Sequence, residues 1–271
     1  MRQLRTVLTA TAGTALLFVS TVAAAQGEDA WQFSASIYGY LPSLSGTTKF
    51  PANGGGSEVS VDSGTILDNL KFTFMGSFEA RQGQWGGFTD VIYLDLGNTK
   101  TATRDLTIGN VQLPAGASAK VEYDLKGWLW TLAGTYRAVA MPAYTLDVLA
   151  GARMLDLTPK LDWSVTGDLG SIAEADRSGH RDSTARNWDA IVGVKGRAAF
   201  GADQTWFVPY YFDLGTGESK FTGQAMAGLG YAFRWGDVLA AWRYIDYQTK
   251  SGSNIERLSL SGPMIAATFR W

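Results

Sequence analysis

Most of the chain after residue 30 alternates between apolar and polar positions with a period of two. This period predicts β-strands that have one face against an apolar phase. The segment Ser261–Trp271 is the clearest case, because it ends the chain on a half-apolar strand with a terminal aromatic residue. Its apolar face carries Ile265, Ala267, Phe269 and Trp271. The pattern predicts an all-β protein in which the last strand has a defined place.

The same alternation predicts ten strands. The first runs from Trp31 to Leu41, the next two cover Lys71–Arg81 and Trp85–Leu96, the fourth ends at Val139, and the others include Thr145–Met154, Asn187–Arg197, Trp206–Leu214, Phe221–Phe233, Val238–Tyr244 and the C-terminal segment. Tight turns follow the second, fourth, sixth and eighth strands. We therefore expect an up-and-down antiparallel barrel, the plan of transmembrane outer-membrane barrels, with both termini on the short-turn side. Lipid forbids open sheet edges, so the first and last strands should pair.

Three long connections are expected on the opposite, extracellular side. They cover Pro42–Asn69, Gly97–Ser118 and about Thr158–Ala185. The first is rich in Gly, Ser and Asn, and short strand-like arms are expected in it at Thr47–Phe50 and Glu58–Val61. Because these segments lack a continuous apolar face, we interpret most of their length as loop.

Outward-facing aromatic residues gather in two groups, as expected for interface belts. The group near the tight turns contains Trp31, Phe33, Trp206, Tyr231, Phe233, Phe269 and Trp271. The second group contains Trp128, Trp188, Phe212, Trp242 and Tyr244. Strand rise and tilt separate the groups by about 25 Å, which suits a bilayer core.

Composition narrows the function classes. The 271 residues include no cysteine and one histidine, and the formal net charge is −2. A disulfide framework and a thiolate metal site are therefore excluded, and no basic stripe indicates nucleic acid as a partner. We expect no cofactor and no metal, and we expect that the protein is not an enzyme.

The N-terminus has the order of a secretory signal peptide. Arg2 and Arg5 form a basic start, Val7–Val22 is apolar, and Ala23–Ala25 provides a small-residue cleavage site before Gln26. Residues 1–25 are therefore predicted to be removed, leaving residues 26–271 as a single barrel domain outside the cytoplasm.

Several runs resemble an uncharacterised family of proteobacterial outer-membrane β-barrel proteins. They are Tyr38–Gly46, Leu67–Leu96, Gly151–Leu157, Asn187–Arg197 and Trp242–Tyr247. The final strand likewise resembles the C-terminal signature of outer-membrane barrels, which is read during assembly. The resemblance implies an outer-membrane barrel and implies as partners the membrane lipid and the barrel-assembly machinery, with Ile265, Ala267, Phe269 and Trp271 as the assembly signal. It implies no reaction.

The inner face is expected to carry charged residues that line the lumen. They are Lys71, Glu79, Arg81, Asp90, Arg137, Asp147, Arg153, Asp189, Lys195, Arg197, Asp213 and Arg243, with Arg270 at the inner rim. Arg137 and Asp147 are equidistant from Pro142 and should face each other across a turn. Lys195 and Asp213 are near-diagonal across the next hairpin. A ten-stranded barrel is narrow, so its buried charges should pair.

Three functions remain open at this point. The leading hypothesis is a narrow, porin-like and presumed monomeric channel for small solutes, with a surplus of arginine favouring anions. The alternative is a structural or surface-interaction barrel, adhesin-like, with a plugged lumen. The third is a loop-based hydrolase that uses His180, which has Asp168, Asp176 and Asp182 near it in sequence. The run Gly215–Lys220 lacks the spacing of a phosphate loop and is interpreted as a hairpin connection.

Overall fold

A computed structural model describes residues 30–48, 57–102, 107–108, 111–112, 118–166, 177–182, 185–250 and 255–271. The predicted signal peptide, residues 1–25, lies outside these described residues.

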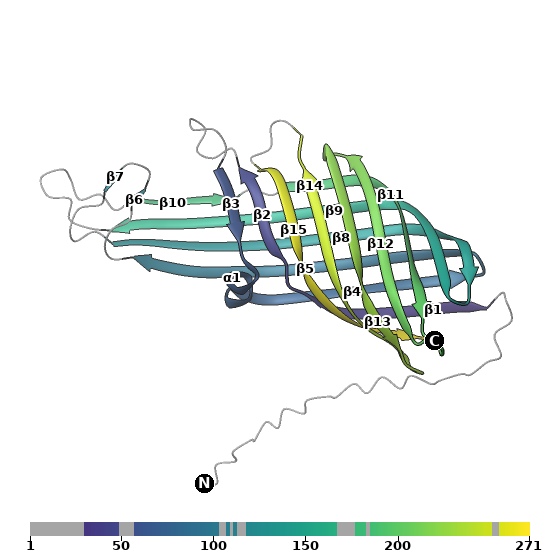
Figure 1. The fold of residues 1–271 in the computed structure, drawn as a ribbon. Coiled ribbons are helices and arrows are strands. Elements are labelled where there is room, and N and C mark those ends of the chain that lie inside the picture. Colours follow the sequence, from purple (N-terminus) through teal and green to yellow (C-terminus); the bar gives the residue numbers. More distant parts are fainter. Residues whose placement is uncertain are drawn as a thin grey trace, which may run out of the picture.

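Ten antiparallel strands form the closed wall of a barrel (Figure 1). In order round the wall they are β1 (Trp31–Tyr40), β4 (Leu70–Gln82), β5 (Trp85–Ala102), β8 (Ser118–Met141), β9 (Tyr144–Thr166), β11 (Ala185–Phe200), β12 (Trp206–Gly217), β13 (Phe221–Ala232), β14 (Gly236–Gln248) and β15 (Ile255–Arg270). The first and last strands pair from Ser34 opposite Arg270 to Tyr40 opposite Met264, which closes the ring. The predicted architecture and its closure are confirmed.

Tight turns join the strands at one end of the barrel, as the sequence predicts. Two of them have only two residues: Gly83 and Gln84 connect β4 to β5, and Pro142 and Ala143 connect β8 to β9. Gly83 has a φ of 56°, a left-handed conformation that glycine adopts without strain. In the plan of outer-membrane barrels this end faces the periplasm.

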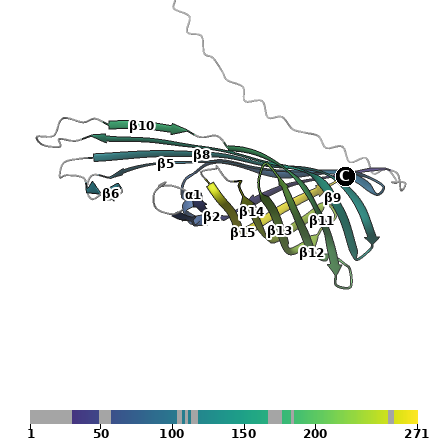
Figure 2. The ribbon, with the colours of Figure 1, turned by 90° about the horizontal axis from the view of Figure 1, so that it is seen from above.

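Strands β5, β8 and β9 continue far past the rest of the wall on the other side (Figures 1 and 2). β8 has 24 residues and β9 has 23, whereas about 9–11 tilted residues cross a bilayer. β10 (Arg177–Asp182) pairs with the far end of β9, and the two-residue strands β6 (Thr107–Ile108) and β7 (Val111–Gln112) pair with each other. We call residues 97–102 of β5, 118–126 of β8 and 158–166 of β9, together with β10, the surface extension.

The surface extension corrects the expectation that Gly97–Ser118 and Thr158–Ala185 are mainly loops. β5 pairs with β8 as far as Ala102 opposite Ala119, and β8 pairs with β9 as far as Ser118 opposite Thr166. Main-chain hydrogen bonds continue there although the apolar alternation has ended. Main-chain pairing does not require a two-residue apolar alternation, so the hydrophobic period does not reveal these strand segments.

The first long connection contains two short strands near the predicted arms, with different bounds. They are β2 (Ser43–Thr48) and β3 (Ser57–Val61), and a short helix, α1 (Ser63–Asp68), follows them. β1 pairs with β4 only up to Ile37 opposite Gly76. Beyond that point the chain stays beside β15, because β2 also pairs with β15. At this division the amide of Tyr40 donates to Met75 Sδ at 3.2 Å.

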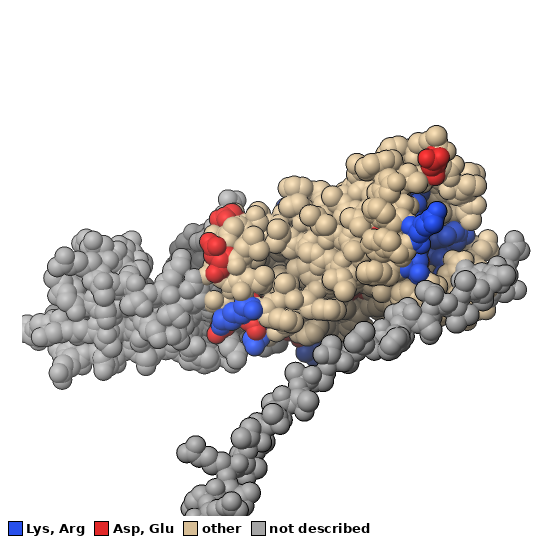
Figure 3. Space-filling model, turned by 90° about the horizontal axis from the view of Figure 1, so that it is seen from below, with Lys and Arg blue, Asp and Glu red and all other residues tan. Residues whose placement is uncertain are grey.

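The outer surface of the wall is apolar. Charged atoms gather toward the two ends of the described surface in Figure 3, and the area between them holds other residue types. Large exposed side chains of the wall strands include Ile37, Leu132, Val192, Trp242 and Ile265. Such an area would be an aggregation liability in water but suits acyl chains. No helix among the described residues is long and apolar enough to span a membrane.

Aromatic rings form a nearly continuous belt near the tight turns. Ring centroids are 5.0 Å apart for Trp206 and Tyr231, 4.7 Å for Tyr231 and Phe233, and 6.0 Å for Phe33 and Trp271. A second group lies toward the extracellular side, where Tyr93 and Trp128 are 4.5 Å apart and Trp130 and Trp188 are 6.0 Å apart. Rings with an apolar body and a polar edge favour membrane interfaces.

Candidate functional site: the lumen

A buried ion pair joins β9 to β12 inside the barrel. Arg153 and Asp213 are both 0% exposed, and the Arg153 guanidinium donates from both terminal nitrogens to the two carboxylate oxygens of Asp213, with Nη1 to Oδ1 at 2.8 Å. Arg153 Nε donates to Thr131 Oγ1 at 3.1 Å. A two-pronged contact of this kind holds both side chains in one orientation.

A second buried pair crosses the lumen between β14 and β5. Arg243 Nη2 donates to Asp90 Oδ1 at 2.6 Å, and the Tyr38 hydroxyl donates to Asp90 Oδ2 at 2.8 Å. Gln224 Oε1 accepts from Arg243 at 3.0 Å and from Arg153 at 3.4 Å, so it links the two pairs. We call Tyr38, Asp90, Arg153, Asp213, Gln224 and Arg243 the polar layer.

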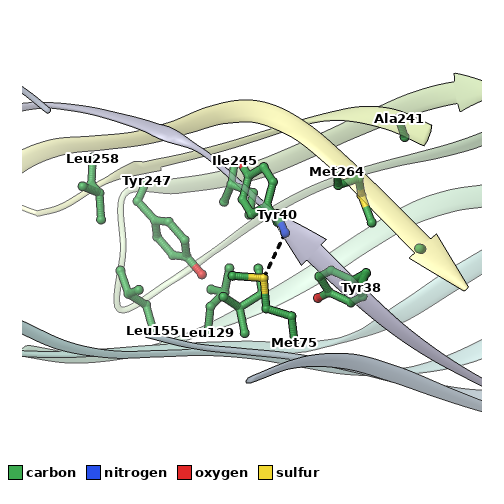
Figure 4. Close-up of a cluster of buried hydrophobic side chains, with 12 residues drawn as sticks. Tyr38, Tyr40, Met75, Leu129, Leu155, Ala241, Ile245, Tyr247, Leu258 and Met264 are labelled. Atoms are coloured by element: carbon green, nitrogen blue, oxygen red, sulfur yellow. Dashed lines mark hydrogen bonds between the residues drawn. The ribbon is translucent and has the colours of Figure 1, made fainter. Parts of the chain in front are cut away.

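An apolar cluster fills the lumen on the extracellular side of the polar layer (Figure 4). Its side chains come from β1, β4, β5, β8, β9, β14 and β15 and include Tyr40, Met75, Ile92, Leu129, Leu155, Ile245, Tyr247 and Leu258. Ile245 is 0% exposed and Tyr247 is 1% exposed. We call this cluster, together with the polar layer, the plug.

A looser charged network lies on the periplasmic side of the polar layer. Asp147 accepts from Arg137 Nε at 2.6 Å and from Arg81 Nη2 at 2.6 Å. Arg81 also donates to Glu79 at 2.6 Å, and Glu79 forms an ion pair with Lys195 from across the barrel. Three cations share two carboxylates in this network.

A third group of charges lies at the periplasmic rim. Asp237 on β14 forms ion pairs with Arg270 on β15 and with Arg197 on β11, where the distance from Arg197 Nη1 is 3.5 Å. The Arg197 guanidinium also stacks over the Phe207 ring, 4.1 Å from its centroid. Arg197 and Arg270 stay partly exposed, with 28% and 45% of their side chains accessible.

The rim and the looser network surround a cavity of about 750 Å³. Its wall runs from Gln32, Pro142 and Arg270 near the tight-turn end to Tyr38, Asp90 and Arg243 in the polar layer. We call this cavity the basin. The plug closes its inner end, so the described lumen is hollow on the periplasmic side and packed on the extracellular side.

The structure brings most of the predicted lumen residues into these networks. Arg137 and Asp147 face each other in register and form the predicted pair. Lys195 and Asp213 are diagonal across their hairpin, but Lys195 bonds Glu79 and Asp213 bonds Arg153 instead. Each of these two side chains therefore bonds an oppositely charged partner on a more distant strand rather than its diagonal neighbour.

Two predicted lumen residues lie apart from the main networks. Lys71 is half exposed near the extracellular end and pairs with Asp124 on β8. Asp189 is buried and accepts from the amide of Ser219 at 2.7 Å, which ties it to the β12–β13 connection. The exposed side chains of Ile265, Phe269 and Trp271 give the last strand its lipid-facing surface. Their role as an assembly signal remains a prediction.

Sequence reasoning missed the neutral partners in the lumen. Tyr38 and Gln224 complete the polar layer, Thr131 accepts a hydrogen bond from its Arg153, and the apolar cluster was not expected there at all. All of these side chains occupy inward positions in the two-residue alternation, which is the signal that could have identified them.

The residues proposed for a hydrolase are only partly described. His180 lies on β10, directly opposite Asp162 of β9, and Asp182 lies opposite Lys160. Asp168 and Asp176 lie outside the described residues. Within the described ranges there is no group of three or more potential metal ligands.

Comparisons with known proteins return barrels of the same kind. No protein-family model matches the chain, and no curated protein matches it. Among solved structures it is similar to the outer membrane protease OmpT from Escherichia coli, at 11% identity and a TM-score of 0.47 over 89% of this chain and 96% of that one. It is also similar to the attachment invasion locus protein Ail of Yersinia pestis, at 10% identity and a TM-score of 0.33 over 90% of this chain and 99% of that one.

A third likeness is to the translocator domain of the autotransporter NalP from Neisseria meningitidis. The identity is 16%, the TM-score is 0.39, and the match covers 91% of this chain and 90% of that one. TM-scores below 0.5 carry no argument about what this chain does.

The location follows from the molecule itself. Pairing round a closed ring leaves no open sheet edge in the lipid, and the exterior here is apolar between two aromatic belts. This is an outer-membrane β-barrel protein.

Proposed function

We propose that the protein is a plugged barrel that anchors the surface extension for contact with an external partner. The plug is the observation that carries this proposal. Side chains from opposite walls meet in it, and Arg153, Asp213 and Ile245 are each 0% exposed. A solute path through the barrel would have to break both the ion pairs and the apolar packing. We further propose that the chain belongs to the proteobacterial barrel family that its sequence resembles.

The surface extension supports the second half of the proposal. Strands beyond the membrane serve no role in spanning it, yet β8 and β9 stay paired from Lys126 opposite Thr158 to Ser118 opposite Thr166. Functional residues concentrate on such projecting elements, which a rigid scaffold positions. We propose that the protein acts by binding and catalyses no reaction.

Conductance measurements test the plug. The purified protein in a planar bilayer should give no resolvable current steps, and insertion is checked by the change in gel mobility that folded barrels show on boiling. Regular steps from the unmodified protein would overturn the proposal. They would favour the narrow channel, the second candidate, for which the basin is the supporting observation.

Cysteine labelling tests the orientation of the surface extension. The chain has no cysteine, so a single one is a clean probe. Lys126→Cys lies on the exposed β8 segment at the start of the extension, and Gln204→Cys lies in an exposed tight turn at the other end. In intact cells a membrane-impermeant maleimide should label Lys126→Cys and spare Gln204→Cys. The reverse labelling would place the extension in the periplasm and refute contact with an external partner.

A further inference from the structure

The basin is a pocket with one entrance. Its mouth lies near Gln32 of β1, Pro142 of the β8–β9 turn and Arg270 of β15, and the polar layer forms its inner end. At about 750 Å³ it has the size of sites that enclose small organic molecules. A blind cavity of this kind would not serve passage, but it could hold a ligand that enters from the periplasm.

The basin wall carries more positive than negative charge. Its basic residues are Arg81, Arg137, Lys195, Arg197, Arg243 and Arg270, and its acidic residues are Glu79, Asp90, Asp147 and Asp237. Six cations therefore face four carboxylates. An anion entering the basin would be attracted by this surplus.

The excess positive charge lies where two cations share one carboxylate. Arg197 and Arg270 share the single carboxylate of Asp237. Deeper in the wall, Arg81 is 5% exposed and uses Nη2 for both Glu79 and Asp147, while its Nη1 has no hydrogen-bond partner among the described residues. Buried donors are rarely left unpaired, so this one is available for a polar ligand group.

Apolar surfaces adjoin these cations. Lys195 Nζ lies 4.3 Å from the centroid of the Phe88 ring, and Phe88 packs 6.0 Å from Tyr211. Phe207 lies under Arg197, and Met226 and Leu239 also line the basin. Hydrated inorganic ions gain nothing from such surfaces, whereas the apolar part of an organic anion does.

We propose that the basin is a binding site, entered from the periplasm, for a small organic anion with an apolar body. The anionic group lies among Arg197, Arg270 and Lys195, and the apolar body lies against Phe88 and Phe207. This site is independent of the surface extension, so it stands or falls separately from the function proposed above.

Calorimetric titration of the protein in phosphatidylcholine nanodiscs tests this site, with empty nanodiscs subtracted. Phenyl phosphate carries both features, inorganic phosphate carries the anion alone, and benzyl alcohol carries the ring alone. Phenyl phosphate should bind at least tenfold more tightly than either of the others. Its affinity should fall as salt concentration rises, because the rim charges are partly exposed.

Matched arginine variants locate the site. Arg197→Gln removes a rim cation but leaves Asp237 paired with Arg270, so the barrel should still fold. Arg186→Gln removes an exposed arginine on β11 that also pairs with one aspartate, Asp156, outside the basin. Arg197→Gln should weaken phenyl phosphate binding about threefold to tenfold, and Arg186→Gln should not change it. Absence of binding by the unmodified protein, equal binding of the three probes, or equal affinities of the two variants would each overturn the proposal.

Discussion

The two halves of the lumen are built from the same strands and the same inward positions, yet one is packed and the other is hollow. In the extracellular half, Arg153 and Arg243 each have a dedicated carboxylate, and apolar side chains fill the remaining space. In the periplasmic half, cations outnumber carboxylates, and Arg137, Arg197 and Arg270 stay partly exposed. Facing inward therefore does not decide whether a barrel is open. What decides it is whether the charges at each depth are paired and whether side chains fill the space between them.

The difference has an energetic reason. A charge fully removed from water is tolerated only when it is paired and its remaining hydrogen bonds are satisfied. Asp213 meets this condition through the two-pronged contact with Arg153. Arg137 and Arg197 need no such partner because water reaches them from the basin.

The largest effect is expected where the plug is most deeply buried. Arg153→Met leaves Asp213 charged and unpaired at a site with 0% exposure. The free energy of unfolding should fall by about 3–5 kcal/mol, measured by denaturant titration of tryptophan fluorescence in lipid vesicles. The double variant Arg153→Met/Asp213→Leu removes both charges and should recover much of the loss. A single-variant loss below about 1 kcal/mol would remove the energetic distinction between the two halves.

The apolar part of the plug should give the next largest effect. Leu155→Ala, at 7% exposure inside the barrel, creates a cavity and should cost about 2–4 kcal/mol in the same assay. Leu132→Ala, on the lipid-facing side of neighbouring β8 at 51% exposure, is the matched control and should cost clearly less. Equal losses would mean that the apolar cluster is not packed as a core.

Charge removal in the basin should have a smaller effect. Arg137→Gln leaves Asp147 bonded to Arg81, and the Arg137 side chain is partly exposed. We expect a loss of about 1 kcal/mol or less. A loss as large as that of Arg153→Met would show that the basin wall is as tightly coupled as the plug.

The smallest effect is expected at α1, outside the membrane-spanning wall. Asp62 caps this helix, and the hydrogen bond from the Thr65 amide lowers the pKa of the Asp62 carboxyl. The cap is therefore fully stabilising above the carboxyl's ordinary pKa and is lost as pH falls through the lowered pKa. The protection factor of the Thr65 amide, which corrects for the intrinsic exchange rate, should fall in Asp62→Ala at neutral pH and, in the unmodified protein, only under acidic conditions. If Asp62→Ala left the protection of the Thr65 amide unchanged, the Asp62 cap would not be what stabilises the start of α1.

Two-residue alternation was sufficient to predict the strands that cross the membrane. A strand between lipid and lumen must change face at every residue, so Trp206–Leu214 and Trp31–Leu41 could be assigned without a structure. The same rule placed Arg137 opposite Asp147, because a short turn fixes the pairing of its two flanking strands. It failed at residues 158–166, where β9 continues past the wall and main-chain pairing with β8 persists without apolar alternation.

Contacts across the lumen lay beyond sequence reasoning. Nothing local to Lys195 indicates that it bonds Glu79 on β4 rather than its near-diagonal neighbour Asp213. Likewise, Gln224 joins Arg153 to Arg243 only because the closed ring brings β13, β9 and β14 to a common depth.

The sequence by itself determined the wall of this protein: the number of crossing strands, the lipid-facing side of each, and the ring they must close. Alternation and turn length act between neighbours, and neighbours suffice to specify a sheet. The tertiary structure alone decided the interior, dividing it into a plug and a basin. Which inward side chains meet depends on the curvature and relative height of strands far apart in the chain, and these are properties of the closed barrel rather than of any segment.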